Sequence, residues 1–383
     1  MNLMNILAIE TSCDETAIAL VEASGGLRAP KFRIVSSVVS SQVKIHAPFG
    51  GVVPNLAKRE HIKNLPIVLK RVFQNSPSTP SLFRVRASGS RTGPRGKFDL
   101  LAVTVGPGLE PALWTGIEFA KKLKRELDVP AVGVNHLEGH LYSFLLSKKA
   151  AGTTHKARSA KRRLDGFEFR ISNFEFPAIA LLVSGGHTIL VLMESLAKWY
   201  KLGETRDDAA GEAFDKVARM LHLSYPGGAE LEKLARKGRA DTISFPRPMI
   251  HAKDYDFSFS GLKTSVLYYM KELSPSVFNV KHSTLKNDIA ASFQAAVIDV
   301  LVTKTVRAAR EYGAKSIMLS GGVAANRALR RALQAASRKL RANFFVPPFK
   351  FNTDNAAMIG VAGYMQYLKN KTRAIRAQGN LNL

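Results

Sequence analysis

Two hairpins of the same kind, one near the start of the chain and one near its middle, constrain the fold most. Residues 6–9 and 17–21 are apolar and flank a polar turn, and residues 178–183 and 189–193 flank a second turn that contains two glycines. Short apolar runs bounded by turn residues are typical of buried strands. The recurrence of strand, polar loop and returning strand indicates a duplicated α/β fold with one phosphate-facing hairpin in each half.

Single strands followed by helices complete the pattern. A continuous apolar run at residues 100–105 predicts an interior strand, and we also expect strands at residues 131–134 and 315–319, with a helix after each of the three. A chain of 383 residues can bury two cores with a cleft between them. Periodicity predicts helices over residues 56–72, 113–127, 209–221, 288–310 and 356–368.

The charge balance favours a polyanionic partner. Lys and Arg number 56 against 30 Asp and Glu, which leaves a formal charge of +26. Such a surplus favours nucleic acid, with a basic but solvated surface as the alternative. Residues 75–97 are rich in Ser, Pro, Gly and Arg, and residues 147–176 are rich in Lys and Arg. We interpret both ranges as basic flexible insertions that either contact phosphates loosely or have no role.

The single cysteine, Cys13, excludes a disulfide framework and favours a reducing compartment. We expect no membrane-spanning segment, because no apolar run reaches the required length, and no leader peptide before the first strand.

A histidine pair directly follows the strand at residues 131–134. His136 and His140 are four residues apart, so in a helix they lie on one face and can share a metal ion. The alternative is a pair of buried, hydrogen-bonded histidines. Leu137 stands where H-E-x-x-H peptidases place their general-base glutamate, and Glu138 points about 100° further round the helix. Peptide hydrolysis is therefore disfavoured.

Acidic residues in two other places are candidates for the same site. Asp354 lies just before the helix at 356–368 and either caps that helix or supplies an oxygen ligand. A set of two histidines and one aspartate suits iron or zinc. Asp14 and Glu15 lie in the first polar turn, which suits phosphate or a water-bridged metal, with an ordinary solvated turn as the alternative.

Further along the chain, several turns are suited to a nucleotide. Gly185 and Gly186 let backbone amides approach an anion. Asp215 and the glycine turn at 227–228 suit a ribose, while Asp207 and Asp208 are candidates for capping the helix at 209–221. The turn ending in Asn326 precedes a helix and suits a base or sugar edge.

Taken in order, these motifs resemble the TsaD family, the tRNA N6-adenosine threonylcarbamoyltransferases once named O-sialoglycoprotein endopeptidases. The resemblance extends over about residues 6–368. It is carried by Ile9-Glu10-Thr11-Ser12-Cys13-Asp14-Glu15-Thr16, the pair His136 and His140, Leu182 to Thr188, Asp207 to Lys216, Phe257 to Lys263, Gly321 to Asn326, and Thr353-Asp354-Asn355.

The resemblance implies an α/β fold of the ASKHA class (actin, sugar kinase and Hsp70), with two ribonuclease H-like lobes around a nucleotide cleft. We expect one catalytic domain over residues 4–368. Its lobes would be residues 4–135 plus 350–368, and residues 136–349. The tail at 369–383 lacks the R-P-R-W-P-L-like ending common in bacterial members, which leaves its contacts open.

The same resemblance implies transfer of the threonylcarbamoyl group from threonylcarbamoyl-AMP to the N6 amine of the adenosine just 3′ of the anticodon, in tRNAs reading codons that begin with A. Family metal ligands match His136, His140 and Asp354, with Fe²⁺ expected and Zn²⁺ as the alternative. Asp14 or Glu15 would accept the amine proton. The adenylate-binding residues match Leu182, Val183, Ser184, Gly185, Gly186, Asp215, Gly228 and Asn326.

Bacterial members work with the proteins TsaB and TsaE, so the resemblance also implies these partners besides tRNA, no membrane, and a bacterial cytoplasm, with the mitochondrial matrix as the alternative. Other functions stay open on the same fold: an ATPase or sugar kinase, which needs no histidine pair, a metallopeptidase, or a tRNA-binding scaffold without activity.

Overall fold

The chain separates into two units in the structure, a computed structural model that describes residues 3–75, 98–146, 167–169, 173–273 and 283–383. The first unit contains residues 1–42, 52–172 and 353–383, and the second contains residues 43–51 and 173–352. The predicted insertions at 75–97 and 147–176 lie largely outside the described residues.

The boundary between the units differs from the expected one at residue 136, because the chain leaves the first unit only after Ser172. Strand β5 (Ala131–Asn135) runs directly into helix α4 (His136–Tyr142). That helix packs against α11 (Ala356–Leu368), which belongs to the first unit as well. The histidine pair and Asp354 are therefore parts of one unit.

A six-stranded sheet organises the first unit, in the order β5-β4-β1-β2-β3-β6. Strands β1, β2 and β3 form an antiparallel meander. Strand β4 pairs in parallel with β1, and β5 pairs in parallel with β4. The bounds are β1 (Met4–Glu10), β2 (Glu15–Ser24), β3 (Lys31–Ser41), β4 (Leu100–Gly106), β5 (Ala131–Asn135) and β6 (Phe167–Phe169).

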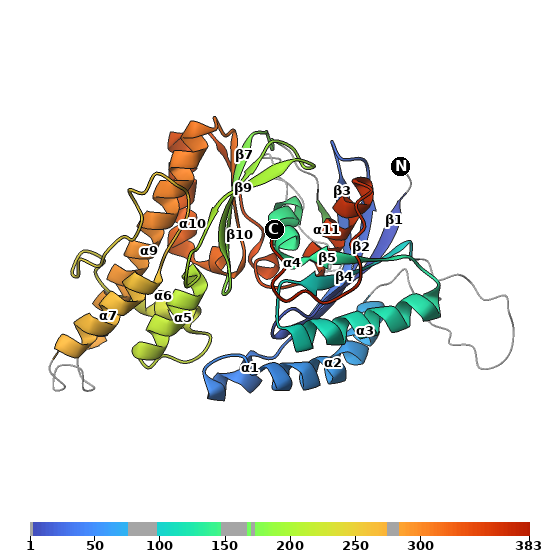
Figure 1. The fold of residues 1–383 in the computed structure, drawn as a ribbon, viewed down its shortest axis with the longest axis horizontal. Helices are drawn as coiled ribbons and strands as arrows, with labels where there is room; N and C mark the ends of the chain where they lie inside the picture. The colour runs from blue at the N-terminus through green and yellow to red at the C-terminus, as the bar shows by residue number, and fades with distance from the viewer. Residues whose placement is uncertain (1–2, 76–97, 147–166, 170–172, 274–282) are drawn as a thin grey trace, which may run out of the picture. The chain divides into compact units, whose positions relative to one another are not determined.

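Helices cover both faces of this sheet (Figure 1). Helices α2 (Pro54–Gln74) and α3 (Glu110–Leu127) pack against each other and share one apolar core with β1, β2 and β4. Helix α11 contacts β1, β2, β4 and β5. Its residues 356–366 are all buried, which explains why it is apolar on every side.

The second unit repeats the same strand order, β11-β10-β7-β8-β9. Strands β7, β8 and β9 form an antiparallel meander, and β10 and β11 add in parallel beside β7. This repeat confirms the duplicated fold predicted from the two hairpins. The bounds are β7 (Ala178–Val183), β8 (Thr188–Met193), β9 (Trp199–Glu204), β10 (Ser316–Ser320) and β11 (Asn343–Phe345).

Helix α9 (Ser283–Glu311) is the central helix of the second unit. It packs against β7 and against three helices, α6 (Gly227–Ala235), α7 (Ser260–Glu272) and α10 (Arg327–Lys339). The absence of a membrane-length apolar run was expected, but Thr284–Glu311 is long and apolar enough to cross a membrane by length and composition. Its most apolar window is 67% buried inside the protein, which is typical of a core helix.

The remaining helices of the second unit are α1 (Val43–His46), α5 (Ala210–Met220), α6 (Gly227–Ala235), α7 (Ser260–Glu272) and α10 (Arg327–Lys339). Single 3-10 turns occur at η1 (Ala47–Phe49), η2 (Ser143–Leu146), η3 (Gly322–Ala325) and η4 (Phe349–Phe351).

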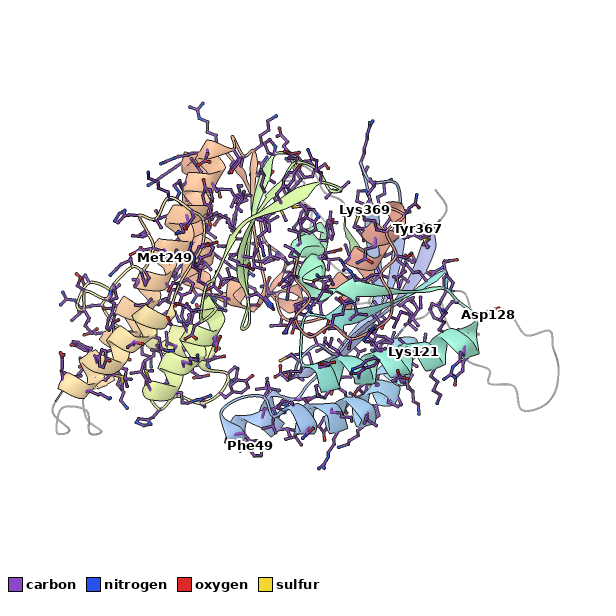
Figure 2. All side chains as sticks on the ribbon, in the orientation of Figure 1. Phe49, Lys121, Asp128, Met249, Tyr367 and Lys369 are labelled. Carbon is purple, nitrogen blue, oxygen red and sulfur yellow. The ribbon has the colours of Figure 1, made fainter. Side chains whose placement is uncertain are left out.

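The C-terminal tail packs on the first unit at the ends of β4 and β5. The Gln378 amide donates to the Val105 carbonyl at 2.8 Å, and the Gly108 amide donates to the Gly379 carbonyl at 3.1 Å. At Gly106, whose φ is 151°, a Cβ would lie 1.9 Å from the Gln378 carbonyl oxygen, so only glycine admits the tail. At the far end of α11, Lys369 donates to the Tyr142 hydroxyl at 2.6 Å (Figure 2).

Candidate metal centre and nucleotide loops

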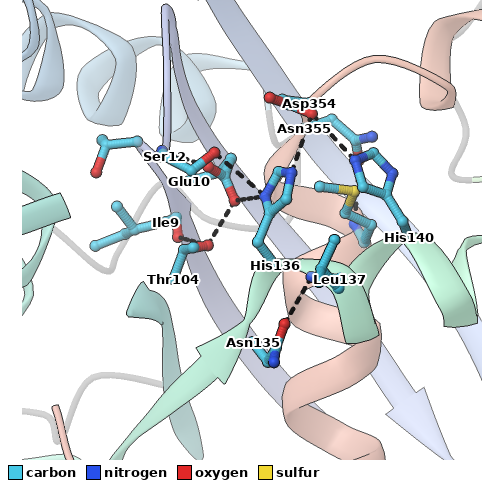
Figure 3. A network of polar contacts seen from close by, with 12 residues as sticks. Ile9, Glu10, Ser12, Thr104, Asn135, His136, Leu137, His140, Asp354 and Asn355 are labelled. Carbon is cyan, nitrogen blue, oxygen red and sulfur yellow. Dashed lines mark hydrogen bonds and ion pairs between the residues drawn. The ribbon is translucent and has the colours of Figure 1, made fainter. Parts of the chain in front are cut away.

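The histidine pair lies on a short helix that begins at the first histidine. Asn135 is the N-cap of α4, and its Oδ1 accepts a hydrogen bond of 2.8 Å from the Leu137 amide (Figure 3). Its Nδ2 donates to the Asn382 carbonyl at 2.8 Å, so the tail supports the cap. The rings of His136 and His140 lie on the same side of the helix, with their centroids 4.6 Å apart. The predicted helical spacing is confirmed.

Asp354 faces both histidines instead of capping the next helix. Asn355 is the cap of α11, since its Oδ1 accepts from the Met358 amide at 3.1 Å. Asp354 Oδ1 lies 3.4 Å from His136 Nε2 and 3.2 Å from His140 Nε2 (Figure 3). One ligand atom from each of these three side chains falls within 4.8 Å of the other two. This convergence is the geometry of a shared cation site.

The hydrogen bonding of His140 tests whether this set fits a metal. The ring is buried, and neither of its nitrogens has a hydrogen-bond partner among the described residues. Leaving a buried polar atom unsatisfied costs about 1–3 kcal/mol. His140 Nε2 lies 3.2 Å from Asp354 Oδ1, so one cation would be within reach of both atoms. A divalent ion bound by two imidazoles and one carboxylate fits the donors present.

Glu10 orients the first histidine from the opposite side. This glutamate is fully buried at the end of β1, and its Oε2 lies 3.1 Å from His136 Nδ1. Thr104 Oγ1 donates to the same carboxylate at 2.5 Å, and the Ser12 amide donates to it at 2.6 Å. A carboxylate on Nδ1 fixes the tautomer that presents Nε2 to a metal. From the sequence, Glu10 was expected only as one of the polar residues of the first turn, whereas in the structure it is the last residue of β1.

Charge in this cluster alternates between carboxylates and imidazoles. Burial raises the pKa of Asp354, but His136 and His140 lower it further, to well below its usual range. Burial lowers the pKa of His136, and the charges of Asp354 and Glu10 outweigh this and hold the pKa well above its usual value. Burial keeps the pKa of His140 below its usual value. In the absence of a cation, a proton on His136 therefore supplies the positive charge.

Of the predicted proton acceptors, Asp14 lies in the turn between β1 and β2, and Glu15 is the first residue of β2. Burial raises the pKa of Glu15 to about 10, and the charges of Asp354 and Asp14 add to the rise. Glu15 therefore holds its proton at neutral pH in this environment. Its Oε1 accepts from the Ser41 hydroxyl at 3.3 Å, and Asp14 is buried beside it.

Glu138, the residue a peptidase mechanism would need, is bound elsewhere. Its carboxylate accepts from Arg373 at 3.2 Å and from Gln366 Nε2 at 3.3 Å. The side chain thus fixes the tail and α11, and peptide hydrolysis has no general base at this position.

In the second unit, the structure brings the predicted loop Leu182–Gly186 against two glycine-containing turns. The loop closes through the Ser184 amide, which donates to the His187 carbonyl at 2.8 Å. A Cβ on Gly211 of α5 would lie 2.5 Å from the Ser184 oxygen, and one on Gly321 would lie 2.4 Å from the Val183 oxygen. A Cβ on Gly185 or Gly186 would have no other atom within 4 Å, so the backbone of these two residues is accessible.

Asp215 and Gly228 also come together. Asp215 Oδ1 accepts a hydrogen bond of 2.9 Å from the Gly228 amide, which joins α5 to the start of α6. Asn326 is instead engaged within the protein. Its Oδ1 caps α10 by accepting from the Leu329 amide at 3.0 Å, and its Nδ2 donates to Gln294 at 2.7 Å.

Capping of α5 by Asp207 or Asp208 is wrong, because Ala209 is the N-cap residue and the first amide of the helix, that of Ala210, donates to the Thr188 hydroxyl at 2.9 Å. Asp207 accepts from the Phe259 amide at 2.8 Å and from the Ser258 hydroxyl at 2.6 Å, at the start of α7. Asp208 pairs with the ammonium groups of Lys216 and Lys263 at 2.7 and 2.8 Å. The two aspartates therefore join the motif at residues 207–216 to the motif at residues 257–263.

Comparison with known proteins identifies the family. The family TsaD, described as tRNA N6-adenosine threonylcarbamoyltransferase, matches residues 33–156 and 166–361. Relatives with that name occur in Thermosipho melanesiensis, at 43% identity over 99% of this chain and 100% of the relative, and in Moorella thermoacetica, at 44% over 95% and 92%. The Bacillus subtilis relative is 41% identical over 99% and 95%.

Solved structures bear on the fold alone. HypF of T. kodakarensis superposes with a TM-score of 0.52 at 14% identity, over 96% of this chain and 49% of HypF, so this chain spans about half of that protein. The likeness confirms the expected ASKHA fold class. The family match over most of the length and the identity of 41–44% to its members agree with the motifs, and the chain belongs to the TsaD family.

Proposed function

We propose that this protein transfers the threonylcarbamoyl group of threonylcarbamoyl-AMP to the N6 amine of the adenosine 3′ of the anticodon, in tRNAs reading codons that begin with A. Membership of the TsaD family supports this reaction. The observation that carries it is the convergence of His136, His140 and Asp354 on one point in a chain of this family. An ATPase or kinase on the same fold has no use for that convergence.

The metal would be held by His136, His140 and Asp354, with Fe²⁺ as the proposed ion and Zn²⁺ as the alternative. Two imidazoles and one carboxylate suit either ion. When bound, such an ion supplies Lewis acidity that polarises the carbamoyl carbonyl.

The protein's own residues prepare this site before substrate arrives. Glu10 holds His136 in one orientation, and Thr104 and Ser12 in turn hold Glu10. Preorganised groups need no rearrangement during the reaction, which matters here because the exocyclic amine of adenine is a poor nucleophile.

Asp14 and Glu15 are the proposed residues for the proton that the amine loses. Burial, Asp354 and Asp14 raise the pKa of Glu15 to about 10, so Glu15 is protonated at neutral pH. Of the two residues, we therefore propose Asp14 as the acceptor. As the amine nitrogen bonds to the carbamoyl carbon, the bond from that carbon to the phosphate oxygen breaks and AMP leaves as a stable anion, while the proton of the amine passes to Asp14.

For threonylcarbamoyl-AMP, the proposed contacts lie in the second unit. Backbone amides of Leu182, Val183, Ser184, Gly185 and Gly186 would face the phosphate, in keeping with the open space at both glycines. Asp215, Gly228 and Asn326 would face the nucleoside. Since the Asn326 side chain is already engaged, its contact would have to come from the backbone.

Partner proteins equivalent to TsaB and TsaE are proposed on the basis of the family, together with a cytoplasmic location. The lone cysteine agrees with a reducing compartment.

The test is a reconstituted reaction. The full chain would be incubated with threonine, bicarbonate, ATP, the carbamoyl-AMP synthase, TsaB, TsaE and an unmodified tRNA, and the digested tRNA analysed by mass spectrometry. We expect threonylcarbamoyl adenosine at the position 3′ of the anticodon. No product with every partner supplied, or ATP hydrolysis without product, would defeat the proposal.

A further inference from the structure

Helix α10 differs in charge from the other helices. Its thirteen residues contain five basic side chains and no acid. The surrounding segment, residues 312–353, contains no Asp or Glu at all. Among the described helices of eight or more residues, each of the others that carries Lys or Arg also carries an acid. The five are Arg327, Arg330, Arg331, Arg338 and Lys339.

Burial separates this helix into two faces. Leu329 and Leu333 are buried on the face that packs against α9 and β11. Arg327, Arg331 and Arg338 are exposed. At 100° per residue these three positions lie within about 40° of each other, so they form one stripe about 16 Å long. Lys339 and Arg341 extend the exposed charge at its end.

Among the described residues, the side chains of this stripe form no ion pair with an acid, although the Arg327 amide donates to Glu232 at 3.1 Å and Arg331 Nε donates to the Arg327 carbonyl at 3.3 Å. Within the described parts of the chain, Arg327, Arg331, Arg338, Lys339 and Arg341 form no ion pair. Surface lysines elsewhere do pair: Lys121 lies 2.8 Å from Glu118 and Lys233 lies 2.6 Å from Glu230. Like charges aligned on one helix face destabilise it slightly and produce a positive field that attracts an anionic partner.

An exposed aromatic ring packs on Arg330, a further basic residue of α10. Phe349 is 54% exposed, and the guanidinium carbon of Arg330 lies 3.9 Å from the centre of its ring. Arg330 also donates to the Ala324 carbonyl and, at 3.3 Å, to the Pro347 carbonyl, which fixes its position. A ring held among cations is suited to an unstacked base next to a contacted phosphate backbone.

We propose that the outer face of α10, together with Phe349, is a docking surface for the sugar-phosphate backbone of tRNA. The proposal rests on the proposed function, which supplies tRNA as the polyanion. Arginine contacts to phosphate give salt-sensitive, sequence-blind affinity. The exposed arginines and Phe349 are neither proposed metal ligands nor proposed nucleotide-binding residues, although Arg327 directly follows Asn326.

The test compares two variants with equal change in charge. The first is R331E/R338E/K339E on α10. The second is K122E/K124E/R125E on α3, the helix that Figure 2 marks with Lys121 and Asp128. Binding of a labelled, unmodified tRNA to each full chain is measured by fluorescence anisotropy over a series of salt concentrations, after circular dichroism has shown that both variants fold.

We expect the α10 variant to lose at least about tenfold in affinity at low salt, and the slope of log affinity against log salt to fall by about 2–3, since each phosphate contact contributes about 0.7–0.9. The α3 variant should change little. An equal loss in both variants, or no loss in either, would overturn the proposal, and so would binding to anionic lipid vesicles that depends on α10 while tRNA binding does not.

Two further variants separate charge from ring. R331K/R338K keeps the positive charge, so the slope of log affinity against log salt should not change. Phe349→Ala should weaken tRNA binding and leave that slope unchanged. A salt slope lost in R331K/R338K would contradict a backbone contact. Product from the unsubstituted chain tests the proposed function, whereas this comparison tests only where tRNA binds. A chain that binds tRNA through α10 and yields no product would keep the surface and lose the function.

Discussion

Glu10 illustrates at the scale of one residue how a buried carboxylate prepares a metal ligand. It has no exposed surface, and its three contacts lead to His136, Thr104 and Ser12. A carboxylate in this position sets the tautomer and orientation of the imidazole.

We predict that Glu10→Gln lowers affinity for the divalent cation by about 10–100-fold, because the amide is uncharged and stabilises the required tautomer less well. Affinity would be measured by competition with a chromophoric chelator. Glu22→Gln, a change on the neighbouring β2 away from the centre, is the matched control. Equal affinities for the two variants would show that Glu10 does not position His136.

The pH dependence of cation binding follows from the raised pKa of His136. Asp354 and Glu10 together hold that pKa well above its usual value against the effect of burial, so a cation must displace a proton at and below neutral pH. Affinity should fall about tenfold per pH unit on acidification and level off once pH exceeds the pKa of His136. The same competition assay over a pH series checks this, and an affinity constant from acidic to neutral pH would contradict it.

Among the secondary-structure elements, the buried strands and the amphipathic helices were predictable. Ala178–Val183 was predicted to the residue, because every one of its side chains is buried and its apolar run is continuous. Strand β9 was missed, since Trp199–Glu204 is mostly half-buried or exposed and shows no regular alternation. Strand β11, three half-buried residues long, gives no signal of its own.

The metal centre was predictable only in part. Spacing showed that His136 and His140 share a helix face, but Asp354 is more than two hundred residues away, so its residue type left helix capping and metal binding both open, and the family resemblance favoured metal binding. Glu10 was missed because an acid at a strand end gives no sign that it is fully buried. The role of Asp207 was missed because its partners, Ser258 and Phe259, are distant in sequence.

Asp207, which precedes α5, is hydrogen-bonded to the start of α7. It accepts hydrogen bonds from the amides of Phe259 and Ser260 and from two hydroxyls, as an N-cap does for α7. We predict that Asp207→Ala lowers the free energy of unfolding by about 1–2 kcal/mol, the usual cost of a lost cap. Urea denaturation would measure it, with Asp241→Ala, a highly exposed site, as control. Equal stability of both variants would rule out this capping role.

At the scale of the whole molecule, each unit has an apolar cluster of its own among the described residues, and the candidate cation site belongs to the first unit alone. One tryptophan reports on each unit, because Trp114 lies on α3 and Trp199 on β9. The single-tryptophan variants Trp199→Phe and Trp114→Phe therefore follow the two units independently.

We predict that a cation at about 100 times its dissociation constant stabilises the unit reported by Trp114 by about 2.7 kcal/mol and the unit reported by Trp199 by less. Denaturant titrations followed by fluorescence, with and without the cation, would measure both. Equal shifts for the two probes would mean that the units unfold as one cooperative structure, contrary to this prediction.

The central claim is that His136, His140 and Asp354 form one metal centre, and metal content tests it most directly. The purified chain and its Asp354→Ala variant would be loaded with Fe²⁺ or Zn²⁺ and desalted, and metal per chain measured by mass spectrometry, with Asp128→Ala as control. We predict about one ion per chain in the unsubstituted protein and the control, and a tenth of that or less in Asp354→Ala, as expected when one of three ligands is removed. Equal metal content in all three proteins would contradict the account.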